Sequence, residues 1–227
     1  MNTKKIITID GPAGSGKSST SKRVASELGY TYLDSGSMYR AVTLKVLELN
    51  INPQSDRQVQ EIAEKAEIEL ISQNGQNQIL LDGKDVTSEI REPKISKTIS
   101  SVAANKGVRS ILAEKQKEIG KYSGIVAEGR DMGTVVFPDA DLKIYMTASI
   151  QARAERRYKQ LLESGIKVDL DKLISEIRER DKMDSTRKHS PLRQADDSII
   201  LDTSNMSLDD QVNWIVDKAK ALGANVS

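Results

Sequence analysis

Apolar residues along the chain alternate between short β-branched runs and longer stretches with helical spacing. Residues 6–9 are a β-branched run ahead of a glycine-rich turn, which predicts a buried strand. Residues 17–28 carry apolar side chains at helical spacing, and Gly29 is placed to end that helix. A strand at 31–33 and a helix at 37–49 follow. This order of strands and helices is typical of a parallel sheet.

The middle of the chain carries hairpin signals instead. Asn74-Gly75 and Asp82-Gly83 are dipeptides typical of tight turns between antiparallel strands. Local hairpins within a parallel pattern predict an inserted subdomain. Its elements would be a helix at 59–67, strands at 68–72 and 78–81, and a third strand that begins at Val86 and Thr87. A helical period then returns over residues 95–117.

The second half of the chain resumes the alternation of strands and helices. Ser207 and Asp210 have the spacing of a capping box, which predicts the start of the last helix. The other predicted elements are strands at 124–127, 142–146 and 199–201, and charged helices at 149–164 and 169–184 joined by Gly165.

These elements predict an α/β protein with a parallel-sheet core, helices on both faces, a small inserted α+β domain and a short helical lid. The expected division assigns residues 1–51, 93–148 and 190–227 to the core, 52–92 to the insertion and 149–189 to the lid region.

Composition removes several classes of function. The 227 residues include no cysteine and one histidine, which excludes disulfides, thiolate chemistry and metal sites rich in Cys or His. The net charge of +1 does not indicate a nucleic-acid or membrane-surface partner. No apolar run approaches the ~20 residues that span a bilayer, and the N-terminal apolar stretch is too short for a signal peptide. We therefore expect a soluble, cytoplasmic protein.

A phosphate-binding loop follows the first predicted strand. Residues 11–18 match G-x-x-x-x-G-K-[ST] without a gap. Small residues let the backbone N–H groups of such a loop surround phosphate oxygens. Lys17 supplies a charge for the β and γ phosphates, and the Ser18 hydroxyl can bind Mg²⁺. The position between a strand and a helix distinguishes this motif from an ordinary glycine-rich turn.

Arginines at neighbouring strand ends indicate a second, anionic substrate. Arg40 and Arg130 each follow a predicted strand, at the sheet edge where ligands of open α/β sheets bind. Either residue alone could instead form an ordinary surface salt bridge. Asp10 leaves two interpretations open: it contacts the loop or a water near Mg²⁺, or it is a structural acid at a strand end.

The two charged helices also leave alternatives. On the second helix the apolar face continues into Arg180, Asp181 and Asp184, so an inward face becomes charged. This pattern predicts a mobile lid that closes on phosphates, or else a solvated helical hairpin with i,i+4 pairs. The arginines of this region are Arg153, Arg156, Arg157, Arg178, Arg180 and Arg187.

Four segments together resemble the bacterial cytidylate kinase family, and the likeness extends over about residues 5–220. They are residues 11–18, Asp34-Ser35-Gly36-Ser37-Met38-Tyr39-Arg40, the string Gly129-Arg130-Asp131-Met132-Gly133-Thr134-Val135-Val136-Phe137-Pro138-Asp139-Ala140, and Glu179-Arg180-Asp181 with Asp184 and Arg187. The string at 129–140 is far more specific than the phosphate loop. Ser19 stands where the family often has Thr, and Glu128 where it often has Asp.

The resemblance implies a P-loop kinase that transfers the γ-phosphoryl group of ATP to CMP or dCMP with Mg²⁺. It assigns ATP binding to Gly11, Pro12, Ala13, Gly14, Ser15, Gly16, Lys17, Ser18 and Ser19, with Ser18 on the metal. It assigns CMP binding to Ser35, Arg40, Ser100, Arg109, Arg130, Asp131, Arg180, Asp184 and Arg187. Catalysis would use Lys17, Arg130, Arg153 and Arg157, the last two from the lid.

Finer roles also come from the resemblance. Arg40 and Arg130 would hold the acceptor phosphate, and Arg109 and Asp131 would read the cytosine edge. Ser100, Arg180 and Asp184 would lie near the sugar. The partners would be small nucleotides, and we expect a monomer. Two alternatives remain: a P-loop kinase for another acceptor such as UMP, AMP or shikimate, and a nucleotide-gated switch.

Overall fold

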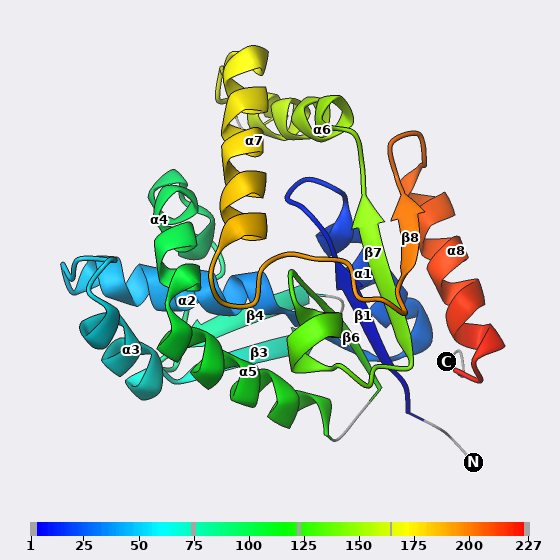
Figure 1. Cartoon of the computed structure of the whole chain (residues 1–227), viewed down its shortest axis with the longest axis horizontal. Helices are drawn as coiled ribbons and strands as arrows, with labels where there is room; N and C mark the ends of the chain where they lie inside the picture. The colour runs from blue at the N-terminus through cyan, green and yellow to red at the C-terminus, as the bar shows by residue number, and fades with distance from the viewer. Residues whose placement is uncertain (1–3, 74–75, 122–123, 164, 225–227) are drawn as a thin grey trace.

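The central sheet has five parallel strands in the order β2-β6-β1-β7-β8 (Figure 1). The computed structural model describes residues 4–73, 76–121, 124–163 and 165–224. The strands are β1 (Ile6–Asp10), β2 (Thr31–Asp34), β6 (Ile125–Gly129), β7 (Leu142–Thr147) and β8 (Ile199–Asp202). β1 is buried over all but its first residue, as the sequence predicts, and β6 is buried throughout, whereas the edge strand β8 exposes Ile199 and Ile200.

Successive side chains of the strands enter two different cores. On β6, Val126 packs with α1 (Lys17–Leu28) and α8 (Leu208–Ala221), whereas its neighbours Ile125 and Ala127 pack toward α5 (Lys106–Gly120). This alternation is the period of two that a pleated strand imposes. It confirms helices on both faces of the sheet.

A second, antiparallel sheet of three strands lies beside the first (Figure 1). Its apolar side chains, with those of α2 (Ser35–Glu48) and α4 (Pro93–Ala104), form one buried cluster. The other elements here are α3 (Asp56–Lys65), β3 (Ile68–Gln73), β4 (Gln76–Leu81), β5 (Lys84–Asp85) and the single turn η1 (Glu89–Arg91). The predicted turn at Asn74-Gly75 lies outside the described residues. The division of the chain into domains stays a prediction.

The predicted start of the third small strand, at Val86 and Thr87, is wrong. The strand is Lys84–Asp85, directly after the turn at Asp82 and Gly83, whose φ angles of 52° and 78° suit a tight hairpin. The Thr87 hydroxyl accepts a bond from the Ile79 N–H (3.1 Å). A side chain therefore occupies the place where a third strand would have continued the ladder.

The helical period at 95–117 is divided between two helices. Asn105 has extended backbone angles, and its side-chain oxygen accepts from the Val108 N–H (3.0 Å), so it caps α5. Its amide also donates to the Asp56 carbonyl (2.9 Å). A periodicity count does not detect such a break, because α4 and α5 each keep the apolar spacing.

The two charged helices are α6 (Ile150–Glu163) and α7 (Leu170–Thr186), and α7 stands clear of the central sheet (Figure 1). Gly165 has a φ of 75°, which suits the turn between them, while Ser164 lies outside the described residues. The capping box at Ser207 and Asp210 is confirmed in both directions. No helix in the described ranges combines the length and the apolar character that crossing a membrane requires.

Candidate active site

The phosphate loop connects β1 to α1 and depends on glycine. A Cβ at Gly11 would lie 1.9 Å from the Met146 carbonyl oxygen, so no other residue fits there. Gly14 and Gly16 have φ angles of 80° and 98°, a region that L side chains avoid. The motif therefore reflects both a close approach to β7 and a left-handed backbone.

Lys17 is buried inside its own loop. Its Nζ donates to the Pro12 carbonyl (2.7 Å) and to the Ser15 hydroxyl (3.3 Å). Burial, with the nearby positive charge of Arg130, lowers the pKa of Lys17 to about 7. A polyphosphate in the loop would favour the charged form, because opposite charges raise the pKa of an amine.

Glu128 lies at the end of β6, opposite the first turn of α1. The Ser18 hydroxyl donates to one of its carboxyl oxygens (3.0 Å), and the Tyr32 hydroxyl donates to the other. Burial and the neighbouring Asp34 raise the pKa of Glu128 to about 7. The carboxyl group and the hydroxyl expected to bind Mg²⁺ are thus in direct contact.

A buried ion pair joins Arg109 of α5 to Asp131, which follows β6. One guanidinium nitrogen of Arg109 donates to Asp131, another donates to the Ala103 carbonyl (3.0 Å), and the guanidinium lies 5.3 Å from the centre of the Tyr39 ring. Arg187 lies 3.9 Å from the second Asp131 oxygen. Burial opposes the charge of Arg109, but Tyr39 and Asp131 outweigh it and raise its pKa.

Asp184 connects the lid to the sheet edge. Its carboxylate accepts from Arg130 Nε (2.8 Å), and Arg187 lies 3.9 Å away. Burial alone would raise the pKa of Asp184, but the charge of Arg130 outweighs it and lowers the pKa. The residues that the resemblance assigns to CMP thus meet from α5, from the segment after β6 and from α7.

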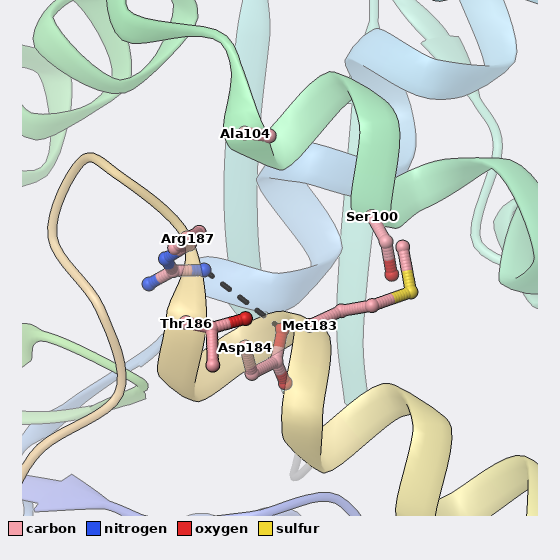
Figure 2. A pocket seen from close by; sticks show the side chains of 6 residues that line it. All are labelled: Ser100, Ala104, Met183, Asp184, Thr186 and Arg187. Atoms are coloured by element: carbon pink, nitrogen blue, oxygen red, sulfur yellow. Dashed lines mark ion pairs between the residues drawn. The ribbon is translucent and has the colours of Figure 1, made fainter.

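A pocket of about 250 Å³ opens beside this cluster, between α4 and α7. Figure 2 shows Ser100 on one wall and Asp184 and Arg187 on the other, with Met183 extending toward Ser100. The structure therefore brings Ser100 to one pocket with Asp184 and Arg187, two other residues that the resemblance assigns to CMP binding. The remaining lining residues are Ala104 and Thr186.

Two half-buried arginines here, Arg180 and Arg40, form no ion pair with a carboxylate of the described residues. Arg180 Nε is buried and has no hydrogen-bond partner among the described residues. Burial and the nearby positive charge of Arg130 lower the pKa of Arg180 to about 10, with further repulsion from Arg40 and Arg157. Arg40 instead donates to the Ile90 carbonyl and the Ser96 hydroxyl, each at 3.1 Å. Such a concentration of positive charge suits an anionic ligand.

Asp10 makes the contacts that its interpretation as a structural acid predicts. Its carboxylate accepts from the backbone N–H groups of Met132 (2.9 Å) and Gly133 (2.8 Å). These groups begin a short helical turn, η2 (Met132–Val136), whose N-cap residue is Asp131. Because Asp10 caps this turn, the Asp131 carboxylate is left for the arginines.

The other residues predicted for the site have different surroundings. Arg157 and Ser19 are exposed, although Arg157 is close enough to repel Arg180. Arg153 pairs with Asp181 (2.7 Å), which links the two lid helices, and donates to the Ala13 carbonyl (3.2 Å). Ser35 is buried, and its hydroxyl donates to the Glu128 carbonyl (2.7 Å).

Sequence reasoning assigned no role to Tyr39 or Thr203 and counted Arg156 only among the arginines of the lid region. Tyr39 stacks under Arg109, although it lies within a quoted motif. Thr203 and Arg156 both contact the carbonyl of Ser15 in the phosphate loop. Thr203 directly follows β8 at the ligand edge of the sheet, and this placement could have identified it.

Comparison with known proteins identifies the family of this chain. The family model for cytidylate kinase matches residues 7–221. This chain belongs to the cytidylate kinase family. A cytidylate kinase from Desulforamulus reducens is 48% identical over 95% of this chain and 97% of its own length. Another from Caldicellulosiruptor bescii is 44% identical over 94% and 95%. The chain is thus a kinase of this family.

A solved structure supports the fold alone. The crystal structure of an uncharacterized protein from Eubacterium ventriosum aligns with 96% of this chain and 99% of its own chain, with a TM-score of 0.55 and 11% sequence identity. At this identity the likeness extends to the α/β architecture and not to the site.

Proposed function

We propose that this cytidylate kinase family member transfers the γ-phosphoryl group of ATP to CMP or dCMP, giving ADP and the nucleoside diphosphate. The observation that carries the proposal is the concentration of arginines between the phosphate loop and α7, where Arg40, Arg130 and Arg180 repel one another. Arg180 has an unpartnered buried nitrogen and a pKa lowered to about 10. Buried charge without a partner is costly, so an acceptor phosphate supplies the missing negative charge.

The transfer breaks the bond between the γ-phosphorus and its bridging oxygen and forms a bond from that phosphorus to a phosphate oxygen of CMP. The acceptor oxygen already carries negative charge, so the reaction needs positioning and charge stabilisation more than a general base. Lys17 would exchange its bond to Pro12 for the β and γ phosphates. Arg40 and Arg130 would hold the acceptor phosphate. Arg180, which the resemblance assigns to the sugar, lies close enough to both to add to the positive charge that stabilises the transfer.

The donor set beside the phosphate loop fits Mg²⁺. The Ser18 hydroxyl contacts the Glu128 carboxyl group at 3.0 Å, and hard cations take oxygen ligands. Mg²⁺ commonly keeps several waters and uses few protein ligands besides the phosphates. Ser18 would hold the ion, with Glu128 orienting Ser18, and bound Mg²⁺ would neutralise charge on the β and γ phosphates.

A panel of acceptors tests the proposal. Release of ADP from ATP and Mg²⁺ should be fast with CMP or dCMP and slower by orders of magnitude with UMP, AMP or shikimate. ATP alone should be hydrolysed slowly. A higher kcat/KM with one of the other acceptors would overturn the proposal, and slow turnover that no acceptor stimulates would favour the nucleotide-gated switch.

Lys17→Ala tests the role of the phosphate loop. Loss of its charge should lower kcat with ATP and CMP by about 10²-fold or more. The fold should survive, because the pKa of about 7 means that the buried charged amine costs stability near neutral pH. Circular dichroism and the thermal midpoint check folding, and unchanged turnover would exclude this role.

A further inference from the structure

The outer side of the phosphate loop is held by side chains from α6 and from the segment after β8. Thr203 is fully buried, and its hydroxyl has two carbonyl oxygens within reach, Ser15 at 2.8 Å and Thr147 at 3.1 Å. The Thr147 carbonyl already accepts from the Thr203 N–H (2.8 Å), so we assign the single hydroxyl proton to the nearer Ser15 oxygen. Arg156 donates to that same oxygen (3.3 Å) and to the Thr203 hydroxyl (3.1 Å). It also donates to the Thr203 carbonyl. One loop carbonyl thus has two donors from parts of the chain far away in sequence.

A second loop carbonyl is held in the same way. Arg153, one helical turn before Arg156 on α6, donates to the Ala13 carbonyl at 3.2 Å. The held peptides are Ala13–Gly14 and Ser15–Gly16. The glycines permit this close approach, because a Cβ at Gly14 would lie 3.2 Å from the Arg153 Cβ.

The direction of these carbonyls sets the direction of two N–H groups. In a trans peptide the C=O and the following N–H point in opposite directions, and the described residues contain no cis peptide. Holding the carbonyls of Ala13 and Ser15 outward therefore turns the N–H groups of Gly14 and Gly16 toward the inside of the loop. Those N–H groups are what a loop of this kind offers to phosphate oxygens.

We propose that Arg156 and Thr203 are positioning residues of the donor site, which fix the Ser15–Gly16 peptide so that the phosphate loop is shaped before ATP binds. The proposal rests on the proposed function, because it takes ATP as the ligand of the loop. Neither residue lies in the acceptor cluster around Asp131. Their loss should weaken the binding of ATP and leave the binding of CMP almost unchanged.

The test compares Thr203→Val with Thr203→Ser by titrating each protein with ATP and Mg²⁺ in a calorimeter. Valine removes the hydroxyl at similar volume and leaves a buried carbonyl short of a donor, so the Kd for ATP should rise about tenfold. Serine keeps the hydroxyl and should stay within about twofold of wild type. The Kd for CMP, measured alone, should change less than twofold in both variants.

Arg156→Met should weaken ATP binding as well. The loss of ATP affinity in the double variant, Thr203→Val with Arg156→Met, should be smaller than the two single losses combined, since both residues act through one carbonyl. Thr43→Val is a matched control, a buried threonine on α2 whose hydroxyl donates to the Tyr39 carbonyl (2.7 Å). It should leave the Kd for ATP unchanged. Circular dichroism and thermal midpoints establish that each variant is folded.

The outcomes separate the two proposals. If wild type binds no ATP, the proposed function fails. If wild type binds ATP and folded Thr203→Val binds it equally well, the positioning role is wrong. Full additivity of Thr203→Val and Arg156→Met would also overturn it, as would an equal loss of CMP binding, because a general loosening of the fold predicts both.

Discussion

The buried carboxylate of Asp10 helps to position Asp131 without contacting the Asp131 side chain. It caps the turn that follows Asp131, so the Asp131 carboxylate stays available to Arg109 and Arg187. Burial outweighs the two backbone hydrogen bonds and raises the pKa of Asp10 to about 6. At neutral pH the negative charge of Asp10 therefore lowers the free energy of unfolding.

This raised pKa predicts a pH dependence of stability. A carboxyl with a pKa near 3.8 unfolded and about 6 folded binds its proton more tightly when folded, so its contribution to stability falls as pH rises through this window. Urea titrations measure this. Between pH 5 and pH 7.5 the free energy of unfolding of wild type should fall by about 1 kcal/mol relative to that of Asp10→Asn.

Asp141→Asn is the matched control for Asp10→Asn. Asp141 accepts from the Ile6 N–H (2.9 Å) at the opposite end of β1, and hydrogen bonds and Lys5 outweigh partial burial to lower its pKa. Because Asp141 loses its proton below pH 5, the difference in free energy of unfolding between Asp141→Asn and wild type should be constant from pH 5 to pH 7.5. A constant difference for Asp10→Asn as well would contradict the raised pKa.

Asp131 is the residue at which base choice should be decided. Cytosine presents an exocyclic amine, which a carboxylate accepts, where uracil presents an acceptor oxygen. Sites built on such bonds discriminate strongly because the wrong base leaves buried groups unpaired. Asp131→Asn, whose amide both donates and accepts, should lower the CMP/UMP ratio of kcat/KM by about tenfold or more.

Steady-state kinetics with CMP and UMP in both proteins measure this ratio. Asp184→Asn is the comparison, since Asp184 binds Arg130 and its loss should slow both acceptors alike. In this structure Asp131 pairs with Arg109 and Arg187, so orienting these arginines is the competing role. An unchanged ratio in Asp131→Asn would assign base choice to Ser35, Arg109 or Arg187.

Local features of the site could be predicted from the sequence, and long-range ones could not. The phosphate loop follows from a motif because its turn is set by neighbouring residues. The contact of Thr203 with Ser15 spans 188 positions, and no local pattern encodes it. The resemblance assigned Arg109 and Asp131 to the cytosine edge but did not predict that they pair, since periodicity places Arg109 on a helix without specifying its partner.

At the scale of elements, capping residues decide where helices begin. Asn105 divides a continuous apolar period into α4 and α5, and the sequence analysis did not predict this. Ser207 was predicted because a capping box has a fixed spacing. Its hydroxyl accepts from the Asp210 N–H (3.1 Å), and its own N–H donates to the Asp210 carboxylate (3.2 Å).

Removing the Ser207 cap should weaken α8 without changing the chemistry. Ser207→Ala leaves a first-turn N–H without its side-chain acceptor, and the free energy of unfolding should fall by about 1 kcal/mol. Urea denaturation measures this, with Ser175→Ala as a control because that exposed hydroxyl donates only within α7. The KM for CMP should not change, and a Ser207→Ala protein as stable as wild type would show that the cap contributes nothing.

At the scale of the whole molecule, a net charge of +1 hides a strong separation of charge. Burial, together with repulsion among arginines from α2, α6, α7 and the segment after β6, lowers the pKa values of Arg40 and Arg180. Composition alone gave no sign of an anionic ligand. The fold creates that preference by bringing these elements to one edge of the sheet.

The smaller sheet and its neighbours should respond to the acceptor. β3, β4 and β5 share no strand with the central sheet and pack with α2 and α4 in one cluster. Arg40, expected to hold the CMP phosphate, donates to the carbonyl of Ile90, which is part of this cluster. A ligand that fixes Arg40 should therefore steady residues 52–92 and reduce their local opening.

Hydrogen exchange followed by mass spectrometry tests this coupling. Amides in residues 52–92 should exchange about threefold to tenfold more slowly with saturating CMP, since ligand binding lowers the population of open states. ATP with Mg²⁺ alone should protect the phosphate loop and leave this region nearly unchanged. Arg40→Met, which keeps the length of the side chain without its charge, should lose most of the CMP effect at the same fractional occupancy. Equal exchange with and without CMP in wild type would mean that these residues play no part in acceptor binding.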